Sequence, residues 1–213
     1  MAEEATPEEA MSGDAVSANT GDRQVSARTH PGLILGIARF YYDPRGAMRG
    51  VLDSQPSEPR LLAYIMIAAM VLLAGRLVQL SFAGGEQVLA SSLAQTVSLL
   101  FFMPLACYGL AALGTWVSRK FGGVGNWSNG RAAFFWATLV SSPVTTGAAL
   151  FQVVLGTDGL AHQVVGQIGS VFLAWALAVC FAETFGFKRV LLVLAFMLGV
   201  VLAMIFGMWA LLK

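Results

Sequence analysis

The chain has 213 residues, of which 57% are hydrophobic and only 12% charged, and its formal net charge is +1. With a mean hydropathy of +0.71, this composition excludes an ordinary soluble domain and indicates a membrane protein. The small net charge excludes a global basic field, so we expect no nucleic-acid partner. Cys107 and Cys180 both fall in apolar runs, where a free thiol behaves as a small hydrophobic side chain.

Residues 1–30 form a polar, acidic tail without a single aromatic residue. Such a segment buries too little apolar surface to offset the entropy of ordering, so we predict that it is disordered. It lacks the basic start and apolar stretch of a secretory signal, which favours a tail that stays in the cytoplasm.

Residues 31–60 combine apolar, aromatic and basic side chains. Helical spacing from Leu33 to Tyr41 predicts a short amphipathic helix that ends at Asp43, and Pro44 can open a second one. We expect this segment to lie on the inner membrane surface, where an apolar face and anionic lipids both attract it. The interfacial anchors would be Phe40, Tyr41, Arg45 and Arg49. A plain cytoplasmic linker is the alternative.

The remaining residues, 61–213, contain apolar runs of about the 20 residues that a helix needs to cross a bilayer. The expected spans are 61–82, 89–117, 132–155, 164–182 and 190–212. Each is expected to be helical, because lipid offers no partner to an open backbone. The predicted fold is therefore all-α: a bundle of five transmembrane helices, preceded by the disordered tail and the interfacial segment.

The Lys and Arg residues predict the orientation. With five crossings, eleven of the thirteen fall on one side, Arg76 lies within a span, and Lys213 stands at the other end. The positive-inside rule then puts the N-terminus in the cytoplasm and the C-terminus outside. This pattern suits a bacterial inner membrane, and it would also suit a eukaryotic early secretory membrane.

Small residues recur every four positions in the last two predicted spans. They are Ser170, Ala174, Ala178 and Ala182 in the fourth span, and Ala195, Gly199, Ala203 and Gly207 in the fifth. Such ridges let helix backbones approach, so we predict packing faces, against each other or against a partner chain. Chance spacing in spans rich in Ala and Gly is the alternative.

Four polar or kink positions are candidates for function. A charge within a span is costly, so Arg76 is a functional hypothesis, with snorkelling or a structural pair with Glu86 as the alternative. Gln95 lies on a polar face of the second span that must turn from lipid. Pro104 and Pro143 should kink two spans near the midplane, as in transporter binding sites, although ordinary spans also contain prolines.

No catalytic or cofactor motif occurs in the sequence. Nucleophile elbows, phosphate loops and zinc-protease signatures are absent, and His162 has no ligand residues at metal-binding spacing. We therefore expect no enzyme activity, no cofactor and no metal.

Residues 40–45, Phe-Tyr-Tyr-Asp-Pro-Arg, followed by closely spaced helices, resemble the bacterial branch of the Ypt-interacting-protein (Yip) domain family. The resemblance covers about residues 33–212 and implies a cytoplasmic N-terminal region with five spans. Eukaryotic members are linked to membrane trafficking and small GTPases and carry a longer Asp-Leu-Tyr-Gly-Pro-like signature. This chain has only Tyr42, Asp43 and Pro44 of that pattern, so a GTPase partner does not carry over.

Three functions compete on this sequence. The first is a non-enzymatic scaffold or accessory subunit that binds other membrane proteins or organises the bilayer, as the small-residue ridges and the basic segment suggest. The second is a small-solute or ion transporter, which could work as a homo-oligomer, motivated by Arg76, Gln95 and the two prolines. An intramembrane enzyme ranks last, because no nucleophile and base converge at one depth.

Overall fold

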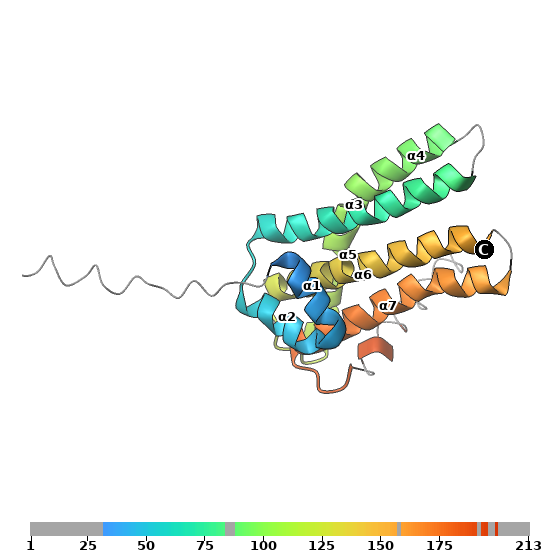
Figure 1. Cartoon of the computed structure of the whole chain (residues 1–213). Helices are drawn as coiled ribbons and strands as arrows, with labels where there is room; N and C mark the ends of the chain where they lie inside the picture. Colours follow the sequence, from blue (N-terminus) through green and yellow to red (C-terminus); the bar gives the residue numbers. More distant parts are fainter. Residues whose placement is uncertain (1–31, 84–87, 157–158, 191–192, 196–198, 200–213) are drawn as a thin grey trace, which may run out of the picture.

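The computed structural model describes residues 32–83, 88–156, 159–190, 193–195 and 199. These residues are almost entirely helical and contain no strand, which confirms the all-α fold class (Figure 1). The elements are α1 (Leu33–Tyr42), α2 (Pro44–Asp53), α3 (Glu58–Ala83), α4 (Val88–Val97), the π-helical η1 (Ser98–Phe102), α5 (Met103–Lys120), α6 (Trp127–Leu155) and α7 (Leu160–Phe185).

Four helical segments of the described chain are long and apolar enough to cross a membrane. They are Glu58–Phe82, Ala90–Lys120, Trp127–Leu155 and Leu160–Phe185, and they correspond to the first four predicted spans. The helices begin earlier or end later than the apolar runs. Helix α6, for example, begins at Trp127, directly after the N-cap residue Asn126. This architecture supports a multi-pass membrane protein.

Two further predictions fall on other parts of the chain. The predicted disordered tail, residues 1–30, lies outside the described residues, and so does most of the predicted fifth span, 190–212. Ala203 and Gly207 belong to that part as well.

Helix α6 lies between α3 and α7 and also contacts α5 (Figure 1). Its residues 132–142 are all buried, whatever face of the helix they occupy. A helix that is surrounded in this way is a core element rather than a surface one. Beyond Pro143 the burial ends, because most residues from there to Leu155 are half-buried or exposed. The bundle is thus tightly packed around the first half of α6 and opens toward Leu155.

Two glycines bring α3 and α7 close to α6. A Cβ at Gly75 would lie 2.8 Å from Thr146 Cγ2, and a Cβ at Gly169 would lie 2.9 Å from Thr145 Cα. The Thr146 hydroxyl also donates a hydrogen bond of 3.1 Å to the carbonyl of Val71. Adjacent threonines on α6 therefore fix its two neighbours at the same level.

The two short helices at the N-terminal side fold onto the bundle. At their junction the Asp43 carboxylate accepts a hydrogen bond of 2.9 Å from the Gly46 amide, and Pro44 supplies the first helical residue of α2. The predicted pair of short helices is therefore present. Part of its apolar surface is turned to protein, whereas Ile34, Leu35 and Tyr42 are exposed. Phe40 and Met48 are fully buried in the core, with Phe40 against Trp175 of α7. Phe40, one of the predicted anchors, is thus a core residue of the described structure.

The backbone of α6 just before Pro143 bonds to a local hydroxyl and to α1. A proline at this position removes the amide that would bond the carbonyl of Leu139, and the Ser142 hydroxyl donates to that carbonyl at 2.9 Å instead. The neighbouring carbonyl, that of Val140, accepts a hydrogen bond of 2.7 Å from the Tyr41 hydroxyl. Partial burial raises the pKa of Tyr41, whose hydroxyl is protonated at neutral pH even without this shift and can therefore donate.

Removal of the Tyr41 hydroxyl should loosen the docking of α1. We expect Tyr41→Phe to lower the free energy of unfolding by about 1 kcal/mol, the usual net value of one hydrogen bond. Tyr42→Phe is the matched control, because Tyr42 is 90% exposed. Thermal unfolding of both variants in the same detergent measures the difference, and equal midpoints would contradict the role of this bond.

Alanine at two helical glycines should have opposite effects. Gly169→Ala forces a Cβ against the backbone of Thr145 and should destabilise the protein by about 1–3 kcal/mol. At Gly147 a Cβ meets no atom of the described residues within 4 Å, so Gly147→Ala should be neutral or stabilising by up to about 1 kcal/mol, as helix propensity predicts. Denaturant unfolding of the two variants measures both signs, and a stable Gly169→Ala protein would rule out the close approach of α6 and α7.

Candidate functional site

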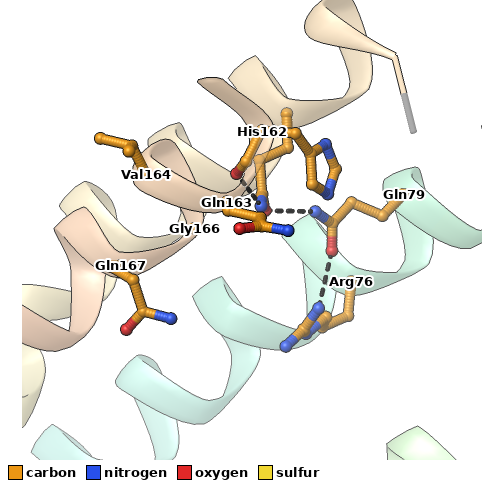
Figure 2. A pocket seen from close by; sticks show the side chains of 8 residues that line it. Arg76, Gln79, His162, Gln163, Val164, Gly166 and Gln167 are labelled. Atoms are coloured by element: carbon orange, nitrogen blue, oxygen red, sulfur yellow. Dashed lines mark hydrogen bonds between the residues drawn. The ribbon is translucent and has the colours of Figure 1, made fainter. Parts of the chain in front are cut away.

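A hollow of about 670 Å³ lies at the open end of the bundle, between α3, α6 and α7. Its lining is mostly polar and comes from all three helices, and Figure 2 shows the α3 and α7 side chains facing one another across it. The lining residues are Arg76, Gln79, Gln152, His162, Gln163, Val164, Gly166 and Gln167. We call this site the polar hollow.

A chain of hydrogen bonds crosses the polar hollow. Arg76 Nη1 donates to Gln79 Oε1 at 2.9 Å, and Gln79 Nε2 donates to the carbonyl of Ala149 at 2.8 Å. The same Nε2 lies 3.4 Å from Gln152 Oε1, while Gln152 Nε2 donates to the carbonyl of His162 at 3.0 Å. Figure 2 draws the links from Arg76 to Gln79 and on toward α7. The side chains of Gln79 and Gln152 therefore join three helices.

The charge in the polar hollow is positive. Arg76 is the one side chain of its lining with a permanent charge, and its guanidinium is exposed. His162 Nδ1 is buried without a hydrogen-bond partner among the described residues. Guanidinium and amide N–H groups together suit a carboxylate or phosphate, which accepts several hydrogen bonds at once.

The residues that line the polar hollow lie within the candidate membrane spans, below the helix ends. Arg76 stands seven residues before the end of α3, and Gln167 stands seven residues after the start of α7. At a rise of 1.5 Å per residue, both lie about 10 Å along the helix axis from those ends. The site is therefore a side opening of the helix bundle and extends below the helix ends.

The other predicted polar and kink positions lie elsewhere. Gln95 is exposed on α4, outside the lining of the polar hollow. Pro104 is buried in the first turn of α5, just after η1, where the Met103 amide bonds the Ser98 carbonyl five residues back. The helix irregularity thus precedes the proline. Glu86, the predicted partner of Arg76, lies outside the described residues.

The predicted ridges and anchors are distributed over several environments. On α7, Ala178 and Ala182 are buried, Ala174 is half-buried and Ser170 is exposed. Ala195 is exposed, and a Cβ at Gly199 would meet no atom of the described part of the chain within 4 Å. Among the anchors, Arg45 is half-buried, and Arg49 forms an ion pair of 2.6 Å with Glu183 at the end of α7. The contact glycine of α7, Gly169, lies beside the predicted ridge.

Sequence reasoning missed the glutamines of the polar hollow. Gln163 and Gln167 are four residues apart on α7, and Gln79 is three residues after Arg76 on α3, so each pair shares a helix face. That spacing could have predicted a polar face on each helix. The pairing across helices was not, because it depends on how α3 and α7 sit on α6.

The opposite end of the bundle contains both ion pairs found among the described residues. One joins Arg49 and Glu183, and the other joins Arg131 at the start of α6 to Glu58 at the start of α3, also at 2.6 Å. We call this the basic end, because Arg60, Arg119 and Lys120 lie there too. Ion pairs thus connect α2 with α7 and α3 with α6 at this end.

No protein-family model, curated protein or solved structure matches the chain. The polar hollow and the basic end are therefore the features from which a function can be proposed.

Gln152 should matter more to the fold than other glutamines of the polar hollow. Gln152→Leu removes the link from α6 to the α7 backbone and to Gln79, so we expect a loss of about 1–2 kcal/mol in the free energy of unfolding. Gln167→Leu is the control, because Gln167 lines the site but makes no hydrogen bond with another described side chain. Equal unfolding midpoints for the two variants would mean that the bond chain does not hold the helices.

Proposed function

We propose that this chain is a non-enzymatic accessory or scaffold subunit that binds another membrane protein through the polar hollow. The observation that carries the proposal is Arg76. This residue is exposed, lies within a candidate span, and donates a hydrogen bond to Gln79. A charge at such a depth is costly unless it is paired or reaches the interface. A partner helix with an Asp or Glu side chain would pair with Arg76 and fill the site.

The closed inner boundary of the polar hollow favours the binding of a partner over the passage of a solute. Toward the centre of the bundle, Gly75 and Gly169 bring α3 and α7 against the two threonines of α6. Beyond that level, residues 132–142 of α6 are buried all round, and α1 and α2 pack on α6 and α7. Within the described residues this arrangement favours a blind site that receives a side chain from the membrane.

A small-solute or ion transporter, assembled as a homo-oligomer, is the second candidate. The bond chain from Arg76 through Gln79 to Gln152 favours it, because polar side chains at membrane depth often line substrate paths. In this case further copies of the chain would complete the path.

We further propose a Yip-like, five-span protein of a bacterial inner membrane, with the basic end facing the cytoplasm. The motif residues Tyr42, Asp43 and Pro44 support the first part, because they form the junction of α1 and α2. The gathering of Arg and Lys at the basic end supports the orientation, by the positive-inside rule. No GTPase partner forms part of this proposal.

Loss of the Arg76 charge should release the partner. In native lipid nanodiscs we expect Arg76→Ala to bind its stoichiometric membrane partner at least about tenfold more weakly, since truncating one member of a buried charge pair costs about 2 kcal/mol or more. Arg60→Ala, on the same helix at the basic end, is the control with the same loss of charge. Quantitative mass spectrometry of the co-purified partner is the measurement.

The two candidate functions differ in their outcomes. A partner that stays bound to Arg76→Ala and to Gln79→Leu would contradict the accessory-subunit proposal. A preparation that contains only this chain and lipid, with a solute flux that Arg76→Ala abolishes, would establish the transporter instead.

A further inference from the structure

A second, smaller hollow lies at the basic end, between the last turn of α5 and the start of α6. It has a volume of about 260 Å³ and is lined by Trp116, Arg119, Lys120 and Trp127. We call it the notch. It is separate from the polar hollow, whose residues lie near the opposite ends of α3, α6 and α7.

Each cation of the notch rests on an indole ring. The Arg119 guanidinium carbon lies 5.8 Å from the centroid of Trp127, and Lys120 Nζ lies 5.8 Å from the centroid of Trp116. Cation–π contact holds the charges in place but leaves their N–H groups free to meet an acceptor. Two cations that line one hollow can both donate hydrogen bonds to a phosphate.

Neither cation of the notch belongs to an ion pair among the described residues. The carboxylates of Glu58 and Glu183 at this end are engaged by Arg131 and Arg49. The notch therefore presents two positive charges that the nearby acids do not neutralise, and an anion is the ligand class that it favours.

An apolar stripe leads from the notch toward the middle of α5. Gly109, Leu113, Trp116 and Lys120 are spaced by four, three and four residues, which places them on one face of the helix, and all four are exposed. Among the described residues, a Cβ at Gly109 would meet no atom within 4 Å, so the stripe has a shallow place at its far end. Measured from Lys120 in the notch to Gly109, this face is about 16 Å long at 1.5 Å per residue.

We propose that the notch binds the phosphate of an anionic phospholipid, with one acyl chain lying along the stripe. Arg119 and Lys120 contact the phosphate, the two indoles lie at headgroup level, and Leu113 and Gly109 contact the chain. Basic pockets and aromatic rings at the end of transmembrane helices are typical of such sites. A soluble phosphate would contact the two cations but would make no contact with the apolar stripe.

The test measures lipid retained by the full-length protein. The protein is reconstituted with phosphatidylglycerol and phosphatidylcholine in equal amounts, extracted in mild detergent, and its bound lipid is quantified by mass spectrometry. We expect the double variant Arg119→Gln, Lys120→Gln to retain about tenfold less phosphatidylglycerol than the unaltered chain. The double variant Lys188→Gln, Arg189→Gln, which loses the same charge just after α7, should retain the normal amount.

Two further arms distinguish a lipid site from a free-phosphate site and from general electrostatic attraction. Gly109→Phe keeps both cations and should lower lipid retention by filling the stripe, so unchanged retention in this variant would overturn the acyl-chain contact. Displacement of the lipid by millimolar inorganic phosphate would identify a free-phosphate site and overturn the proposal. Equal lipid loss in the two charge variants would also overturn it, because the effect would then follow from the loss of charge alone.

Discussion

The burial of α6 from all sides is the constraint on which the rest of the structure depends. A helix whose residues 132–142 have no exposed face must be surrounded, and α2, α3, α5 and α7 take positions around it. Close contact is possible because glycines meet threonines at Gly75 and Gly169. Small side chains give this approach without a hydrophobic driving force, which lipid cannot supply between helices.

The two ends of the bundle are held together by different interactions. At the basic end, ion pairs such as Arg49 with Glu183 connect α2 to α7. At the other end, amides rather than charges connect α3, α6 and α7, since Gln79 and Gln152 each donate to a backbone carbonyl. Amide bonds hold helices together at membrane depth without the desolvation cost of a second charge. The amides of Gln79 and Gln152 thus connect the helices, and the charge of Arg76 remains available to a ligand or partner.

The sequence predicted those features that depend on one helix at a time. Apolar runs located the four described spans, and the Asp43-Pro44 pair located the break between two short helices. Features that depend on contacts between distant segments could not be predicted. Phe40 has the same helical spacing whether its ring enters lipid or protein, and only the presence of Trp175 on α7 decides between them.

The docking of α1 and α2 has a consequence for how the protein is made. Tyr41 contacts a carbonyl 99 residues later in the chain, and Arg49 pairs with a carboxylate 134 residues later. At a synthesis rate of roughly 5–20 residues per second, the acceptor of Arg49 emerges on the order of ten seconds after Arg49 itself. During that interval Phe40 lacks Trp175, the side chain of α7 that it packs against. The N-terminal helices can therefore complete their contacts with α7 only after that helix has been made.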